Sequence, residues 1–270
     1  MRRLCCSICC WLVSIHFLAL GCASPKVITI QQQRPSEHLP DFVLHLPGVG
    51  GYMSIDRGML RGLQEGGLEH ADVEVYDWTN GDRGFGALVA YDRNQEQAQI
   101  IADKITARYR ADPRAKIYVT CHSGGAGVAV WALEKLPDDV QIETLLMLSP
   151  ALSPQYDLSP ALRHVRTKAH AFTSTGDLLV LGAGTRMFGT MDRVKIDAAG
   201  RIGFATPDAP EYPDQYRKLV AWPYDPDWMQ YGNIGDHIGN MTRSFARNVL
   251  APVLLNGTLA TAHVEPVDRS

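Results

Sequence analysis

Residues 117–133 read IYVTCHSGGAGVAVWAL, and this stretch decides the fold of the chain. The residues IYVT form a short apolar run rich in β-branched side chains, which is typical of a buried strand. The segment from about Gly124 to Leu136 is apolar on nearly every side, as expected of a helix at the centre of a fold. The stretch therefore predicts a central strand, a tight turn and a central helix in direct succession.

Strands and helices alternate on both sides of this stretch. Further strands are predicted at 41–46, 71–78, 144–148, 169–174 and 218–224, and 27–30 can add an edge strand. Helices are predicted at 53–67 with Ser54 as N-cap, at 92–113, and near the C-terminus with Met241, Phe245, Val249 and Leu250 on one side. Short apolar strands alternating with helices predict an α/β fold, with a mostly parallel central sheet flanked by helices and no large cap domain.

The composition is that of one ordinary globular domain. The chain has 270 residues, of which 46% are hydrophobic and 20% are charged, and its formal net charge is -3. This length is sufficient for one large domain with its own core. No run of Lys and Arg supplies the clustered cations that phosphate groups require, so a nucleic-acid partner is not expected.

The N-terminal segment predicts export. Residues 1–22 begin with two arginines, continue as an apolar run and end in small residues, which is the pattern of a signal peptide. Residues 23–40 are polar and punctuated by proline, and are interpreted as a tether. The packed domain is placed at 41–255, and residues 256–270 are expected to form a loose tail.

The end of the signal segment points to a lipid anchor. Residues 19–22, ALGC, resemble a bacterial lipobox, and the resemblance implies a lipid on Cys22 in the cell envelope. The residue after Cys22 is Ala23 and not an acidic residue, which favours an anchor in the outer membrane. The alternative is cleavage after Ala23 and release as a soluble secreted or periplasmic protein. Cys121 is the cysteine that remains in the mature fold, so no disulfide is expected there.

Ser123 lies where a nucleophilic serine needs to lie. Such a serine must project clear of the sheet, within reach of a base and of amide donors for a developing oxyanion. A sharp strand-to-helix turn provides that projection if the residues two before and two after the serine are small, as Cys121 and Gly125 are. The amide of Gly124 can approach a substrate closely, at the positive end of the following helix.

The segment CHSGG resembles the nucleophile elbow of the α/β-hydrolase family, whose pattern is G-x-S-x-G, with Cys121 in place of the first glycine. In that family the acid and then the histidine follow the nucleophile, each on a loop after a strand. The resemblance implies Asp177, after AHAFTSTG, as the acid and His237, in YGNIGDHIGN, as the base. It implies that His237 takes the proton of Ser123 and returns it to the leaving group, while Asp177 orients the imidazole.

The remaining oxyanion donor is expected after the first core strand. Residues 45–52, HLPGVGGY, are similar to the family's His-Gly-x-Gly segment, although Pro47 stands where the family has histidine. The resemblance implies the amide of Val49, with that of Gly50 next, as partner to the amide of Gly124.

Other residues compete for these roles. Asp236, which directly precedes the histidine, and Asp192 are alternatives to Asp177 as the acid. His122 is interpreted as a residue that packs beside the elbow, and Cys121 as a buried packing residue rather than a thiol nucleophile.

Together these residues predict an exported serine hydrolase that cleaves a small acyl-ester substrate through an acyl-enzyme. A thioesterase, an acyltransferase or a peptidase on the same fold stays open, as does an anchored binding protein without activity. The chain has no H-E-x-x-H motif, so neither a metal nor another cofactor is expected. Residues 182–216 are expected to cover an otherwise open site, and the oligomeric state is left open.

Overall fold

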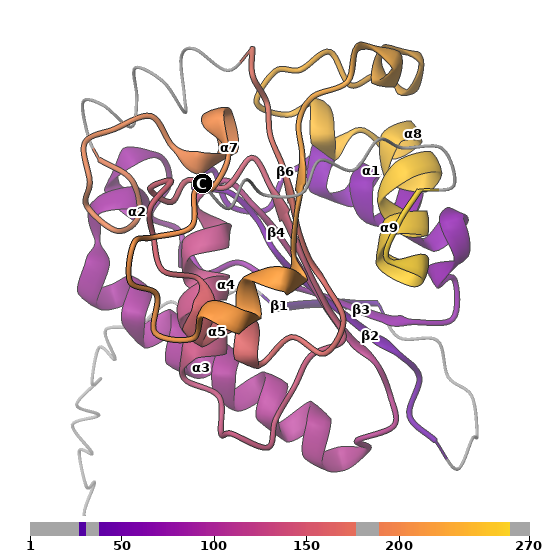
Figure 1. Ribbon diagram of the computed structural model, residues 1–270. Helices are drawn as coiled ribbons and strands as arrows, with labels where there is room; N and C mark the ends of the chain where they lie inside the picture. Colours follow the sequence, from indigo (N-terminus) through magenta and orange to yellow (C-terminus); the bar gives the residue numbers. More distant parts are fainter. Residues whose placement is uncertain (1–26, 31–37, 177–188, 260–270) are drawn as a thin grey trace, which may run out of the picture.

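The fold is organised around one twisted sheet. The computed structural model describes residues 27–30, 38–176 and 189–259, and within them the strand order is β1-β3-β2-β4-β5-β6-β7 (Figure 1). The strands are β1 (Val27–Ile30), β2 (Phe42–Leu46), β3 (Asp72–Tyr76), β4 (Ile117–His122), β5 (Thr144–Leu148), β6 (Ala169–Phe172) and β7 (Leu219–Trp222). β1 runs antiparallel to β3, and the other neighbours pair in parallel. The predicted mostly parallel sheet is confirmed.

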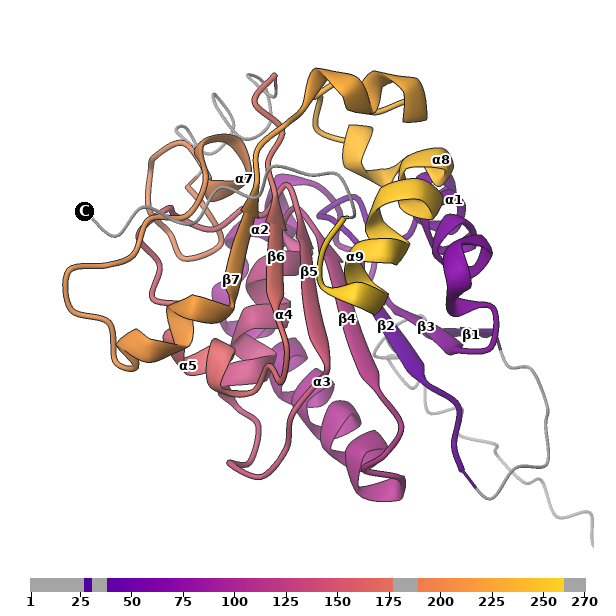
Figure 2. The same cartoon turned by 45° about the vertical axis from the view of Figure 1, so that its right-hand side comes forward.

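Helices cover both faces of this sheet (Figure 2). One face carries α3 (Tyr91–Ala111), α4 (Gly125–Glu134) and α5 (Ser159–Arg163). The other carries α1 (Ser54–Leu63), α8 (Arg243–Phe245), the π-helical turn η6 (Ala246–Leu250) and α9 (Ala251–Asn256). Shorter elements lie in the connections: η1 (Gln64–Leu68), α2 (Phe85–Val89), α7 (Ala199–Ile202), η3 (Pro213–Lys218), η4 (Pro226–Tyr231) and η5 (Gly239–Met241). None of the helices in the described ranges has the length and apolar character needed to cross a bilayer.

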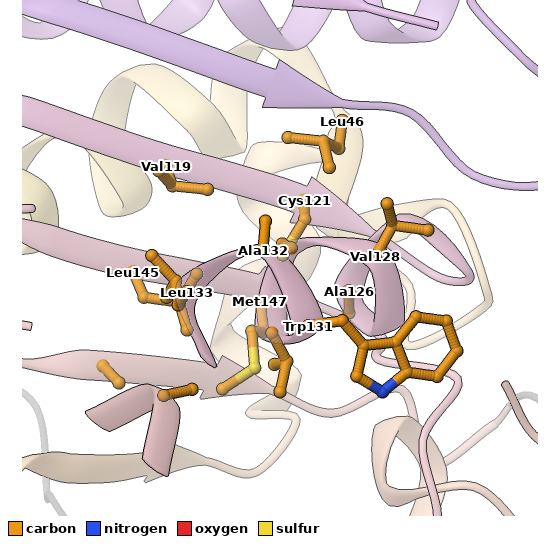
Figure 3. Packing of buried hydrophobic residues seen from close by; sticks show 14 of the residues in the cluster. Leu46, Val119, Cys121, Ala126, Val128, Trp131, Ala132, Leu133, Leu145 and Met147 are labelled. Atoms are coloured by element: carbon orange, nitrogen blue, oxygen red, sulfur yellow. The ribbon is translucent and has the colours of Figure 1, made fainter. Parts of the chain in front are cut away.

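Helix α4 is enclosed by the rest of the fold. Every residue from Gly125 to Leu133 is buried, because α3 and α5 flank the helix and the sheet lies beneath it. Figure 3 shows Val128, Ala132 and Leu133 of α4 among the side chains that β2, β4 and β5 contribute to this core. A fully buried aliphatic side chain of this size contributes about 1.5–3 kcal/mol. The apolar core therefore fixes the direction of α4, and with it the turn at Ser123.

Two details of the N-terminal half refine the prediction. Residues 27–30, which the sequence leaves open as an edge strand within the tether, form β1 and pair with β3. Ser54 is the first residue of α1 rather than its N-cap, which is Met53. The carboxylate of Asp56 accepts a hydrogen bond from the Met53 amide at 2.7 Å, so a side chain inside the first turn ties the helix back to its N-cap backbone.

Buried His170 on β6 predicts a loss of stability in acid. Its Nδ1 accepts from the indole N–H of Trp222 at 3.0 Å, and burial, with a smaller contribution from Lys168, lowers its pKa to about 3. Below the unfolded-state pKa of about 6.5, the unfolded chain binds a proton that folded His170 does not. The free energy of unfolding therefore falls as the pH drops from about 6.5 towards about 3.

The variant His170→Asn isolates this contribution, because asparagine keeps an acceptor for Trp222 and does not titrate. We expect the slope of unfolding free energy against pH to be shallower in His170→Asn by up to about 1.4 kcal/mol per pH unit. Urea unfolding of both proteins between about pH 7 and about pH 4 measures the difference. Equal slopes in the two proteins would show that His170 is protonated in the folded state.

Candidate active site

Ser123 sits in a strained turn between the central strand and the central helix. It directly follows β4, and its φ of 50° lies in the left-handed region that residues other than glycine rarely adopt. The turn is held from both sides: the Ser123 amide donates to the carbonyl of Leu148 at 2.9 Å, and its carbonyl accepts from the amides of Ala126 and Ala151, each at 3.1 Å. This is the backbone geometry that a nucleophile elbow requires.

Glycine at two positions permits the close packing of this turn. A Cβ on Gly125 would lie 2.4 Å from the carbonyl oxygen of Pro47 and 2.6 Å from that of Leu46, so α4 starts directly against the end of β2. A Cβ on Gly48 would lie 3.4 Å from Cβ of Ser123. The loop after β2 therefore lies beside the serine.

Cys121, the departure from the family pattern, fits its position. The side chain is fully buried, and its thiol donates to the carbonyl of Leu146 on β5 at 3.4 Å. Burial raises the pKa of this thiol well above its usual range, so it is not a thiolate. The interpretation of Cys121 as a packing residue is confirmed.

The loop after β2 packs against the turn of Ser123. Its turn is closed by the Gly51 amide, which donates to the Gly48 carbonyl at 2.9 Å, and is tied to the chain after β3 by the indole of Trp78, which donates to the Pro47 carbonyl at 2.7 Å. A Cβ on Gly124 would lie 2.7 Å from Cγ1 of Val49, so these two residues face each other. The amides of the three predicted donors have no acceptor within the described part of the chain: Val49, Gly50 and Gly124.

A buried polar pair supports the same loop from below. Nε2 of His45 lies 3.0 Å from Oδ1 of Asp56, and its Nδ1 lies 2.9 Å from the hydroxyl of Thr120 on β4. Burial by itself would raise the pKa of Asp56, but the hydrogen bond and charge of His45 hold it below its usual value. The pair thus fastens β2 to the first turn of α1 on either side of the glycine-rich loop.

His237 packs against His122, the residue that directly precedes the serine. The rings of His122 and His237 lie 4.8 Å apart between centroids, and Nε2 of His122 lies 3.1 Å from the His237 carbonyl oxygen. Since a carbonyl only accepts, Nε2 of His122 carries the proton. Burial, and then the nearby His237, lower the pKa of His122 far below its usual value, so it is uncharged at neutral pH. His122 therefore positions His237, a role that goes beyond packing beside the elbow.

A buried network of polar side chains holds the loop that carries His237. The amide nitrogen of Asn240 donates to the hydroxyls of Ser149 at 3.2 Å and Ser174 at 3.0 Å, which lie 2.7 Å from each other. The side chain of Asn233 donates to Asn240 at 2.7 Å and accepts from the amide of Gly235 at 3.0 Å. Sequence reasoning missed this network, and its available signal was the pair of asparagines that bracket the glycine-rich loop.

Asp177 lies outside the described residues, but its neighbour places the chain that leads to it. The amide of Gly176 donates to the carbonyl of Gly235 at 3.0 Å. The backbone directly before Asp177 is therefore joined to the backbone two residues before His237. The role of Asp177 as the acid stays a prediction.

The two alternative acids have other surroundings. Asp192 accepts from the Ser153 amide at 2.9 Å and from the Thr190 hydroxyl at 2.6 Å, so its carboxylate joins its own turn to the loop after β5. Oδ1 of Asp236 is buried against Gly239 and has no hydrogen-bond partner among the described residues.

The described part of the segment expected to cover the site, from Gly189 onwards, reaches the first turn of α4. The Met191 amide donates to the Ala151 carbonyl at 2.9 Å, and its Sδ would lie 3.4 Å from a Cβ on Gly124. Nothing in the sequence had singled out Met191, because this contact joins residues far apart along the chain. Within the described ranges no three His, Cys, Asp or Glu side chains cluster as a metal site would require.

The site thus combines a strained serine, three amides near it and a histidine held against its neighbour. The serine hydroxyl can be a nucleophile if the histidine accepts its proton, and the amides can stabilise an oxyanion. Groups of these kinds are among those that acyl transfer uses.

Comparisons with known proteins give a likeness of fold. No protein-family model matches the sequence, and no curated protein matches it. The acylaminoacyl peptidase of Pyrococcus horikoshii is similar in structure, with a TM-score of 0.50 and 12% identity over 86% of this chain and 39% of the peptidase. The chain thus spans well under half of that protein.

Two further structures resemble most of the chain. One is a dienelactone hydrolase-like promiscuous phosphotriesterase from metagenomic libraries, with a TM-score of 0.47 and 10% identity over 82% of this chain and 87% of that one. The other is a CIB-like hydrolase from Thermoplasma acidophilum, with a TM-score of 0.47 and 13% identity over 87% of this chain and 95% of that one.

Proposed function

We propose that this chain, which has the α/β-hydrolase fold, is a serine hydrolase that cleaves an ester-type acyl bond through an acyl-enzyme. The observation that carries the proposal is the left-handed conformation of Ser123 at the end of β4, with three amides and the His237 loop around it. Strained backbone conformations at residues other than glycine cluster at functional sites, and this supports a role for Ser123.

In the proposed mechanism, His237 accepts the proton of Ser123 as its oxygen attacks the substrate carbonyl. The resulting oxyanion accepts hydrogen bonds from the amides of Gly124 and Val49, with Gly50 as the alternative second donor. His237 then donates the proton to the leaving alcohol, which departs and leaves an acyl group on Ser123. Water, deprotonated by His237, attacks this acyl group; the bond to the Ser123 oxygen breaks, His237 returns the proton to that oxygen, and the acid is released. His122, uncharged and donating to the His237 carbonyl, keeps the imidazole in place throughout.

The type of acyl bond is tested with a panel of substrates. We expect turnover of p-nitrophenyl esters, with slower reaction of matched thioesters and amides. Faster turnover of the thioesters would favour a thioesterase, and transfer to an added alcohol in preference to water would favour an acyltransferase. A folded protein that turns over none of them would support the anchored binding protein instead.

Asp177 is proposed as the acid that orients His237, and Asp236 supplies a matched control. We expect Asp177→Asn to lower kcat on the order of 10⁴-fold, because an amide favours the wrong imidazole tautomer. We expect Asp236→Asn to have a much weaker effect, because the Asp236 carboxylate packs against Gly239. Initial rates with a p-nitrophenyl ester measure both variants. A reversed order of the two effects would assign the acid role to Asp236.

Export and anchoring belong to the same proposal. The leader at 1–22 directs the chain out of the cytoplasm, and a lipid on Cys22 retains it at a membrane. Mass spectrometry of the mature N-terminus tests this: a diacylglycerol-modified Cys22 supports the anchor, whereas an unmodified N-terminus at Ser24 shows cleavage after Ala23.

A further inference from the structure

Exposed apolar side chains gather at one edge of the molecule. Eight of the eleven large hydrophobic residues that are exposed in the described ranges lie on segments at the carboxyl edge of the parallel strands, where Ser123 lies. They form what we call the apolar rim: Met53, Val89, Val194, Ile196, Ile202, Met229, Ile234 and Ile238. The other three are Leu39, Ile100 and Leu255. The rim includes the most exposed of the set, with Ile234 at 61%, Met229 at 60% and Ile202 at 55%.

The rim surrounds the candidate active site. Met53 packs beside Gly50 of the glycine-rich loop, with its Cε 3.3 Å from the position of a Cβ there. Ile234 and Ile238 lie in the loop of His237, one on either side of it in the sequence. Ile202 lies on α7, whose Gly200 carbonyl accepts from the amide of Ser174 at 2.7 Å. In Figure 1, α2 and α7 lie at the same end of the sheet as the carboxyl end of β4.

The register of β1 places the chain's entry at this same edge. Because β1 is antiparallel to β3, its first residue, Val27, pairs with the last residue of β3, Tyr76. Two residues later Trp78 packs against the start of α4, where its ring would lie 3.3 Å from a Cβ on Gly124. The chain therefore enters the sheet at the carboxyl edge of the parallel strands, where Ser123 lies, and not at the opposite edge.

The distance from this entry to the proposed anchor is short. Cys22 precedes Val27 by a segment that spans at most about 18 Å when fully extended. A lipid on Cys22 would hold the carboxyl edge near the bilayer surface, where exposed apolar side chains gain from burial among acyl chains. The exposed turn between Val194 and Ile196 also carries Lys195, whose ammonium group can reach lipid phosphates.

We infer that the apolar rim docks on a phospholipid bilayer, in the leaflet that holds the anchor, so that the site faces the membrane and takes an acyl ester of that membrane as its substrate. The substrate half of this inference rests on the proposed hydrolase function. The docking half rests on the rim, on the register of β1 and on the anchor proposed at Cys22, and it requires no catalysis.

Membrane depth tests the docking. The full chain is produced with its own leader, and the processed protein carries Ile202→Cys, or Ile100→Cys on α3 as control, labelled with an environment-sensitive fluorophore. Cys121 is buried, so it escapes labelling. In phosphatidylcholine and phosphatidylglycerol vesicles we expect a blue shift and quenching by spin-labelled lipids at position 202, and neither at position 100. Equal responses at both positions, or none at either, would overturn the inference.

Kinetics test the substrate. We expect Ile202→Asp to lower the ratio of activity on a vesicle-embedded ester to activity on a soluble p-nitrophenyl ester roughly tenfold. Ile100→Asp, a matched change on an exposed helical isoleucine, should leave this ratio unchanged. An unaltered ratio in Ile202→Asp would refute a membrane substrate. If the wild-type protein turns over neither ester but still shows the blue shift and quenching at position 202, the hydrolase proposal is refuted and the docking inference stands. A wild-type dimer that Ile202→Asp converts to a monomer would assign the rim to a second copy of the chain and overturn the inference.

Discussion

Replacing Ser123 with alanine is expected to abolish covalent labelling by a fluorophosphonate probe and to lower ester hydrolysis on the order of 10⁶-fold. The reason is chemical: without the hydroxyl no acyl-enzyme forms, and the amides near Ser123 can only assist direct attack by water. The fold should be retained, because alanine adds no atoms to a side chain that is 3% exposed and the turn is held by backbone hydrogen bonds.

Ser149 provides the control for this experiment. It also follows a central strand, β5, with a left-handed φ of 48°, but its hydroxyl is engaged with Ser174 and Asn240. We expect Ser149→Ala to be labelled by the probe, at a lower rate, because the loop of His237 loses part of its support. Gel fluorescence and intact mass report labelling, and circular dichroism reports folding. Persistent labelling of a folded Ser123→Ala protein would remove Ser123 from the mechanism.

Replacing Gly125 with alanine is expected to destabilise the protein by about 3 kcal/mol or more and to impair labelling of Ser123. The added Cβ would lie 2.4 Å from the Pro47 carbonyl oxygen and 2.6 Å from that of Leu46, and backbone atoms cannot move as a side chain can. Relief of this overlap must separate α4 from the end of β2. That movement carries the Gly48–Gly51 turn, and the amides of Val49 and Gly50, away from the serine.

Gly58 on α1 is the matched control, because a Cβ there has nothing within 4 Å. Gly58→Ala is expected to stabilise the protein by about 0.5–1 kcal/mol, since alanine is the better helix former. Urea unfolding gives both stabilities, and probe labelling at low urea gives the state of the site. A Gly125→Ala protein as stable and as readily labelled as the wild type would contradict the close contact between α4 and β2.

The sequence by itself determined the parts of this protein that depend on neighbours along the chain. The apolar run at 117–120, the small residues around Ser123 and the continuous apolar character of α4 are local requirements, so they predicted the central strand, the turn and the buried helix together. The resemblance to the α/β-hydrolase family, through the order of nucleophile, acid and histidine, implied His237 as the base. The sequence left open whether residues 27–30 form an edge strand, because a short apolar run does not show whether it pairs or with which strand.

Only the tertiary structure decided which distant groups meet. The contact between His122 and His237 joins residues 115 positions apart, and the network from Ser149 to Asn240 spans 91. Periodicity and spacing carry no information at such separations; these contacts arise because parallel strands end at one edge of the sheet and bring their loops together. The antiparallel register of β1 is of the same kind. It is a pairing choice between backbones, and it alone places the start of the sheet at the edge where Ser123 lies.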